Sequence, residues 1–171
     1  MSKVQVNSTA RTRDPITKGI PRYDEISQTI SDYGWRLVGV IPDPDESSNS
    51  PIRYVPFIYT IGNYECGLPE LLMIGHVYAG ALNAIVASMR NNNHAFTDGE
   101  IIDLGGKSKP KAFWANDEAR EFTVQVGVYY GTNDYAVQQI VFPDPSGRFP
   151  DDPRCDRPFR FVPLLRNNGK H

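Results

Sequence analysis

The chain has 171 residues and a formal net charge of −2 at pH 7, with 40% hydrophobic and 22% charged residues. A chain of this size is typical of one domain and can bury enough surface to fold without a disulfide or a structural metal. The balance of apolar and charged residues excludes a disordered chain. The mildly acidic charge argues against a general nucleic-acid-binding protein.

The segment 1–20 is polar and lacks hydrophobic periodicity, which predicts a flexible N-terminal arm ahead of a single globular domain over 21–171. We find no apolar stretch of a secretory signal there, and no run approaches the roughly 20 apolar residues of a membrane span. Cys66 and Cys155 lie far apart and belong to no zinc-binding motif. We therefore expect a soluble, cytoplasmic protein with reduced thiols, no metal, no cofactor and no membrane contact.

The first part of the domain predicts a helix followed by a hairpin. Apolar residues at helical spacing predict a short amphipathic helix over Tyr23 to Tyr33. Strands are predicted over 35–41 and 53–61, and the Pro-, Asp- and Ser-rich segment 42–51 is the loop of an antiparallel hairpin. Pro56 cannot donate a ladder hydrogen bond, so it predicts a sheet edge or a bulge.

A short apolar run over Glu70 to Ile74 predicts a buried strand, and the longest helix is expected after it. This helix has a sustained apolar stripe, at whose centre Leu82 and Ile85 should be fully buried. It should end at Asn91 to Asn93, because Asn tolerates the left-handed conformation of a C-cap.

The second part of the domain contains one ambiguous segment. A short strand is predicted over 100–104, and a central strand over 135–142. In 117–130, alternating β-branched residues favour a strand, whereas an Asn-Asp start signal favours a helix, and we slightly favour the helix. From Pro143 onward the composition predicts an irregular tail. Together the elements predict an α+β domain with a mixed, mainly antiparallel sheet and one long helix packed on a face.

Several short motifs occur in an order that resembles one known family. They are PFIYTIG at 56–62, PEL at 69–71, AFTDG at 95–99, QQIVFPD at 138–144 and GRFP at 147–150. This ordered set resembles the DUF4262 family, a bacterial family of domains of unknown function. The resemblance covers most of the chain and implies no particular reaction.

The chain departs from that family's pattern in its last part. Asp151 stands where the family tends to have a Trp, and Arg157-Pro158-Phe159 stands in place of a Gln-Pro-Leu tail. Any role of that tail is therefore in doubt here. The strand, loop and PEL arrangement also resembles immunity-type domains of the Suppressor-of-fused superfamily, which bind protein partners. That likeness concerns the fold, and a fold does not imply a function.

Five polar side chains at predicted strand ends are the candidate binding residues. Glu70 is the candidate catalytic residue, because a carboxylate at the mouth of a strand can act as a general base. The alternative is that Glu70 accepts hydrogen bonds from loop N–H groups, that Tyr59 packs in the core, and that Asp144 is a turn residue. The candidate binding residues are Tyr59, Thr60, Glu70, Gln139 and Asp144.

Two functional hypotheses follow from these observations. The first is a binding or interaction module, of which an immunity-like domain is one form, with an unknown protein as partner. The second is a small-molecule hydrolase or transferase with its site at the strand ends. Convergent polar groups in one concave site would favour the enzyme, and a flat aromatic patch would favour the module. The sequence leaves the oligomeric state open.

Overall fold

The computed structural model describes residues 23–41 and 55–167, so the predicted arm and the predicted hairpin loop lie outside the described residues. In the described part, six strands form one sheet with the order β1-β2-β3-β6-β5-β4. All neighbouring strands are antiparallel except β3 and β6. The α+β class and the mixed, mainly antiparallel sheet are therefore confirmed. The strands are β1 (Arg36–Val40), β2 (Phe57–Ile61), β3 (Glu70–Ile74), β4 (Glu100–Ile101), β5 (Lys111–Trp114) and β6 (Val137–Val141).

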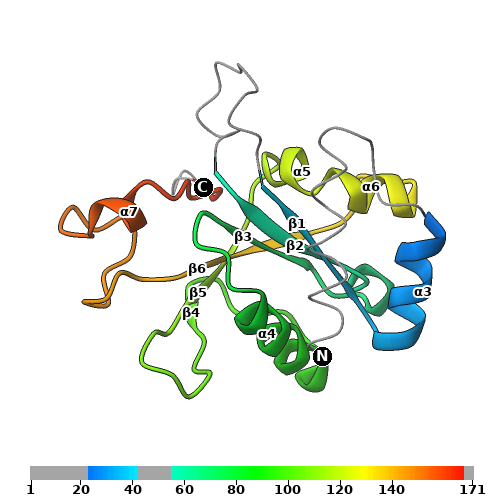
Figure 1. Ribbon diagram of the computed structural model, residues 1–171, viewed down its shortest axis with the longest axis horizontal. Helices are drawn as coiled ribbons and strands as arrows, with labels where there is room; N and C mark the ends of the chain where they lie inside the picture. The colour runs from blue at the N-terminus through cyan, green and yellow to red at the C-terminus, as the bar shows by residue number, and fades with distance from the viewer. Residues whose placement is uncertain (1–22, 42–54, 168–171) are drawn as a thin grey trace.

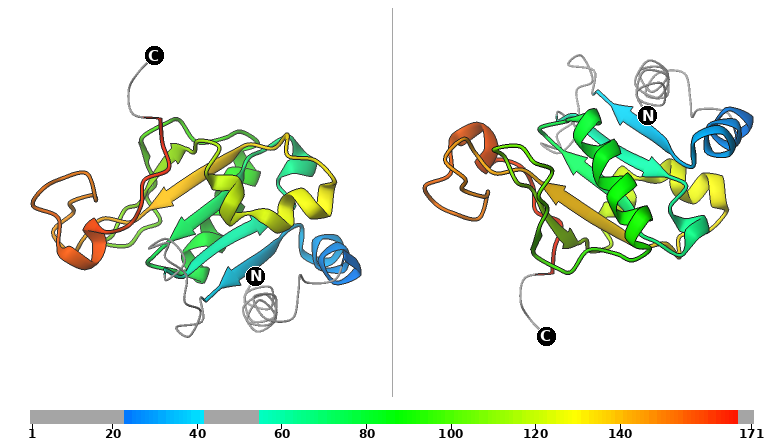
Figure 2. Two further views of the ribbon diagram at one scale, coloured as in Figure 1. Left: turned by 90° about the horizontal axis from the view of Figure 1, so that it is seen from above. Right: turned by 90° about the horizontal axis from the view of Figure 1, so that it is seen from below.

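Helices cover both faces of this sheet (Figure 1). Helix α4 crosses one face, and α5 and α6 lie on the opposite face, as the two views of Figure 2 show. The expectation of one long helix on a single face is therefore not confirmed, because it omits the second helical layer. The helices are α3 (Tyr23–Tyr33), the 3-10 turn η2 (Tyr64–Cys66), α4 (Ala79–Asn92), α5 (Ala119–Phe122), α6 (Val124–Tyr130) and α7 (Arg157–Arg160).

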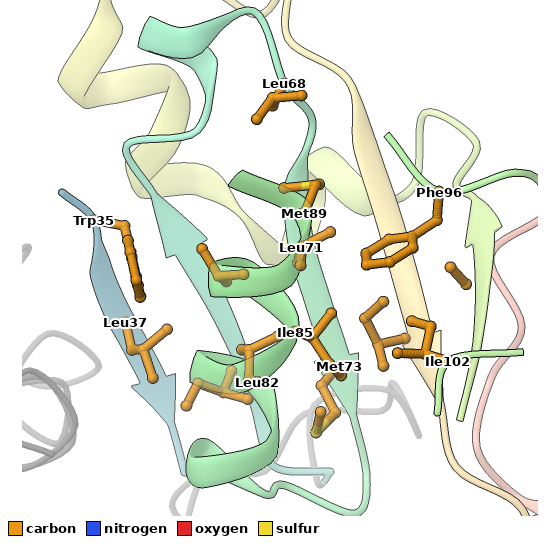
Figure 3. Close-up of a cluster of buried hydrophobic side chains, with 14 residues drawn as sticks. Trp35, Leu37, Leu68, Leu71, Met73, Leu82, Ile85, Met89, Phe96 and Ile102 are labelled. Atoms are coloured by element: carbon orange, nitrogen blue, oxygen red, sulfur yellow. The ribbon is translucent and has the colours of Figure 1, made fainter. Parts of the chain in front are cut away.

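Each face of the sheet has its own hydrophobic core. Successive side chains of a strand point to opposite faces, so Leu71 of β3 packs in the core under α4, and Leu72 packs in the core under α5 and α6. Figure 3 shows Leu82, Ile85 and Met89 of α4 facing the first core. All three are fully buried, which confirms the expectation for Leu82 and Ile85.

The ambiguous segment 117–130 is helical, so the strand alternative is wrong. Phe122 and Val126, four residues apart, are buried together in the second core. A strand would have buried Val124 and Val128 in alternation, but both are exposed. The helical spacing therefore outweighs the β-branched composition, because tertiary packing overrides intrinsic propensity.

Four further points differ from what the sequence predicts. Pro56 marks neither an edge nor a bulge: β2 begins after it at Phe57 and pairs with β1 and β3 on its two sides. Strand β5 was not expected, because its four residues are too few to show a clear alternation. The predicted strand over 100–104 is reduced to the two residues of β4, and the predicted irregular tail contains the single turn α7.

Candidate functional site

Glu70 closes the turn between β2 and β3. Its side chain is 0% exposed, and its Oε2 accepts a hydrogen bond from Thr60 Oγ1 at 2.6 Å. Its Oε1 accepts the backbone N–H groups of Gly62 at 3.1 Å and Tyr64 at 2.9 Å. Thr60 Oγ1 in turn accepts the N–H of Leu71 at 2.9 Å. These are the contacts of a structural acceptor for loop N–H groups.

The chemistry open to Glu70 is limited by its burial. Burial raises the pKa of Glu70 to about 7, against the hydrogen bonds from Thr60, Tyr64 and Gly62 and the charge of Arg90, which lower it. A carboxyl that titrates near neutral pH suits general base catalysis only where it can reach the proton of a substrate. Here both oxygens accept protein donors and neither side of the carboxyl is open to solvent.

The same turn is fastened to α3 and α4. Gly62 has a φ of 130°, and a Cβ there would stand 2.8 Å from the backbone oxygen of Gly34, so only glycine fits. Arg90 of α4 donates from Nε to Asn63 Oδ1 at 3.0 Å and from Nη2 to the same Gly34 oxygen at 2.6 Å. Its Nη1 lies 3.0 Å from Cys66 Sγ. The hydrogen bonds around Glu70 therefore connect the β2–β3 turn to α4 and to the residue that follows α3.

Tyr59 and Gln139 are also bonded inside the protein. Tyr59 is buried, its hydroxyl bonds to the backbone of Gln125, and burial raises the pKa of Tyr59 above its ordinary value. Gln139 Nε2 donates to the carbonyl oxygen of Pro163 at 2.7 Å, and its Oε1 accepts the N–H of Leu165 at 2.8 Å. Gln139 thus fastens the C-terminal segment to the centre of β6.

Asp144 is a turn residue beyond the end of β6. Its Oδ1 accepts the N–H groups of Ser146 at 2.9 Å and Arg148 at 2.8 Å, and its Oδ2 accepts that of Asp156 at 2.9 Å. Burial works to raise the pKa of Asp144, but these backbone donors and the Arg148 charge outweigh it and hold the pKa below its ordinary value.

The topology separates the predicted binding residues. Thr60 and Glu70 meet through a hydrogen bond, and Glu70 lies level with Val137 in the parallel pairing of β3 and β6. Asp144 comes seven residues after Val137, which places it roughly 20 Å along the strand direction. Asp144 is hydrogen bonded to Asp156, the residue before α7, and Figure 1 shows α7 and α3 at opposite ends of the molecule. Tyr59 and Gln139 lie between these ends, so the fold does not bring the set around one depression.

A groove that the sequence did not predict lies beside α6 and is named here the α6 groove. It has a volume of about 500 Å³ and is lined by one side of α6 and the turn that follows it. Val124 and Val128 of this side are 50% and 57% exposed. Gly127 lets the turn approach, because a Cβ there would lie 2.8 Å from Asn133 Oδ1. The four-residue spacing of the two valines indicates this face once the segment 117–130 is taken as a helix.

A second depression, named here the Trp114 depression, adjoins the α6 groove. It has a volume of about 360 Å³ and lies where β5 ends, α5 begins and β6 begins. Arg120 lines both hollows, which are therefore neighbours. This depression could not be predicted from the sequence, because β5, which forms one side of it, was not predicted. Its polar and aromatic lining comprises Trp114, Asn116, Asp117, Arg120, Asp134 and Tyr135.

A row of four tyrosines holds α6 in place beside this surface. The rings of Tyr23 and Tyr129 stack with centroids 4.7 Å apart, and those of Tyr130 and Tyr64 also lie 4.7 Å apart. Tyr129 and Tyr130 are in edge contact at 4.9 Å. The row joins α3, α6 and η2, and Tyr130 donates a hydrogen bond to Glu65 at 3.3 Å. Helix α6 therefore presents its exposed side from a fixed position.

Residues 23–41 and 55–167 hold no group of three or more His, Cys, Asp or Glu side chains that could bind a metal ion. None of the helices described in these ranges has the length and apolar character needed to cross a membrane.

Comparison with known proteins assigns the family. No curated protein matches the chain, and no solved structure matches it. The sequence model of the family described as Domain of unknown function (DUF4262) matches residues 29–156. This match runs from α3 through all six strands and ends just before α7, and it confirms the family resemblance of the ordered motifs. The chain therefore belongs to the family Domain of unknown function (DUF4262).

Proposed function

We propose that this chain is a protein-binding module and that the surface formed by the α6 groove and the Trp114 depression is its docking face. The observation that carries the proposal is the pair of exposed valines, Val124 and Val128, which line a groove on a rigidly held helix. Contiguous exposed apolar surface flanked by polar residues is typical of protein interaction sites. The immunity-type domains that the sequence resembles also act by binding proteins.

The charge around this face indicates the chemistry of the partner. The segment 115–137 contains Asp117, Glu118, Glu121 and Asp134 but only one basic residue, Arg120. All four acidic residues are exposed. A basic partner surface would be attracted to this face, and an apolar side chain of the partner would fill the α6 groove.

The enzyme hypothesis receives less support from the geometry. It relied on Glu70, Tyr59 and Gln139, each of which is buried and hydrogen bonded within the protein. A reacting group has to reach its substrate, and none of these three lines either hollow of the docking face.

Photo-crosslinking tests the proposed docking face. A benzophenone amino acid is placed at Val128 and, as the control, at Ile101, which is 54% exposed on β4 at the far edge of the sheet. We expect position 128 alone to capture one defined protein from cells of the source organism. That protein is then purified, and its affinity is measured for the Val128→Glu and Ile101→Glu variants.

The expected result is a loss of about tenfold or more in affinity for Val128→Glu, because an apolar contact at the centre of an interface is replaced by a charge. Ile101→Glu should bind as the unchanged protein does, and both variants should keep the original melting temperature. Equal capture at the two positions, or a partner that binds Val128→Glu normally, would contradict the proposed face.

A further inference from the structure

A basic and apolar tip, named here the α7 tip (residues 157–161), is exposed at the end of the molecule. Phe161 is 70% exposed, and Arg160 Cζ lies 5.7 Å from the centroid of its ring. Arg157 and Arg160 are also exposed, and neither forms an ion pair within residues 23–41 and 55–167. The two arginines outnumber Asp156, the acidic residue just before α7, so the tip is basic.

Packing beneath α7 fixes the position of this tip. The rings of Phe159 and His76 stack with centroids 4.0 Å apart, and His76 Nε2 donates a hydrogen bond to the carbonyl oxygen of Pro158 at 3.0 Å. Val162, the residue after the tip, is buried. Because both Phe159 and Val162 are packed against the body of the protein, Phe161 is presented to solvent from a fixed position.

The docking face has the complementary chemistry. Val124 and Val128 supply exposed apolar surface along the α6 groove, and the exposed Glu121 is among its lining residues. In the part of the chain that the structure describes, Glu121 forms no ion pair. The volume of about 500 Å³ falls in the range of pockets that hold small molecules, so the groove has room for an aromatic ring. Aromatic and arginine side chains are enriched at protein interfaces.

The α6 groove and the α7 tip cannot meet within one copy. Figure 1 and both views of Figure 2 show α6 and α7 at opposite ends of the molecule, with the sheet between them. The tip of one copy can therefore fill the groove of another copy but not its own. Such a contact joins two different surfaces, so it is heterologous and leaves a free groove on one copy and a free tip on the other.

We propose that the partner of the docking face is a second copy of this chain, whose α7 tip docks in the α6 groove. Phe161 fills the groove against Val124 and Val128, and Arg157 and Arg160 face the acidic residues that surround it. Charge complementarity between the tip and the face sets the orientation of the two copies. This inference rests on the proposed function, since it names the partner that the docking face binds.

Sedimentation velocity over a wide range of protein concentration tests this head-to-tail contact. We expect the full chain to associate as its concentration rises, and to associate less at high salt, because salt screens exposed charges. Val128→Glu alters the groove and Phe161→Ser alters the tip, so each should raise the Kd of self-association by about tenfold or more. Ile101→Glu, on β4, is the control and should associate as the unchanged protein does.

An equimolar mixture of the two variants gives the sharpest result. Val128→Glu keeps its tip and Phe161→Ser keeps its groove, so the mixture should form a complex of one copy of each that grows no further. Arg157→Glu is a second tip variant, which should weaken association while Phe161 stays in place. All these substitutions are at exposed positions, so the melting temperature should not change.

Each outcome supports or overturns the head-to-tail contact. A chain that stays monomeric at every concentration, association that survives Val128→Glu or Phe161→Ser, or a mixture that forms no complex would overturn it. If the chain is monomeric while position 128 captures a different protein, the head-to-tail contact falls and the docking face stands. If association survives Val128→Glu and position 128 captures nothing, the proposed function falls as well.

Discussion

The hydrogen-bond donors of the surrounding turn determine the role of the Glu70 carboxyl. Thr60 Oγ1 already accepts the N–H of Leu71 and the Nδ2 of Asn63, so its own proton points to Glu70. The Thr60 hydroxyl and the two N–H groups of the turn therefore give the Glu70 carboxyl three donors. Since the group is buried, the charge that these donors favour is opposed by desolvation.

Because burial raises the pKa of Glu70, the free energy of unfolding should fall as pH rises from weakly acidic to neutral values. The pKa of Glu70 is raised from its ordinary value of 4.5 to about 7 in the folded protein, so between these values the folded state holds a proton that the unfolded chain has released. The stability that Glu70 contributes is complete below the lower value and is lost as pH rises through the upper one. Between the two pKa values, the free energy of unfolding should fall by up to about 1.4 kcal/mol per pH unit.

Urea unfolding from about pH 5 to pH 8 of the original protein and of Glu70→Gln measures this effect, because other titrating groups cancel in the difference. At pH 5, Glu70→Gln should be about 1–3 kcal/mol less stable than the original protein, since its amide nitrogen faces donors. This difference should shrink as pH rises to about 7, the pKa of Glu70 in the folded protein, and should stay constant above it. Glu118→Gln, an exposed control, should change little. Parallel pH profiles for the original protein and Glu70→Gln would contradict the raised pKa.

At the level of single elements, periodicity succeeded where a helix or strand has one clear buried side. The predicted helix over Tyr23 to Tyr33 matches α3, and Asn93 caps α4 with a φ of 53° in the left-handed region, as expected. Strand β3 was predicted from its apolar run and β6 as a central strand, and both are buried along their whole length. Strand β5 escaped prediction because only Ala112 and Phe113 of its four residues are buried.

Helix α4 carries a direct test of the core beneath it. Leu82 is fully buried against the sheet, so Leu82→Ala should lower the free energy of unfolding by about 2–5 kcal/mol, through lost burial and the cavity left behind. Asn91→Ala, at an exposed position of the same helix, should change it by less than about 1 kcal/mol. Urea denaturation of the two variants gives both values. A loss below about 1 kcal/mol for Leu82→Ala would mean that α4 buries a different side.

At the scale of the whole molecule, strand connectivity decides which residues meet, and the sequence carries little information on it. The ordered family motifs suggested that Glu70 and Asp144 share a site. The parallel pairing of β3 with β6 instead puts them at opposite ends of the sheet. The docking face also depends on connectivity, because the Trp114 depression forms only where β5 and β6 lie side by side. Non-local pairing of this kind leaves no periodic signal in either strand.

The reactivity of the two cysteines measures whether the fold covers them, and needs no substitution in the core. Both are free, as the sequence analysis expected, but Cys66 is exposed and Cys155 is buried. The Cys155 thiol donates to the carbonyl oxygen of Arg148 at 3.3 Å, and burial raises its pKa. A thiol reacts as the thiolate, so Cys155 should react only when the segment around it opens.

We therefore expect two phases when the native protein is treated with an aromatic disulfide reagent. One thiol equivalent, from Cys66, should react at once, and the second should react slowly and faster with added urea, because the reagent must wait for opening. Cys66→Ser should lose only the fast phase, and Cys155→Ala only the slow one. The melting temperature should be the same with and without reductant, since no bridge is present to break. Two fast equivalents would mean that the C-terminal segment does not cover Cys155, and a mass two hydrogens too low would reveal a disulfide that this fold does not contain.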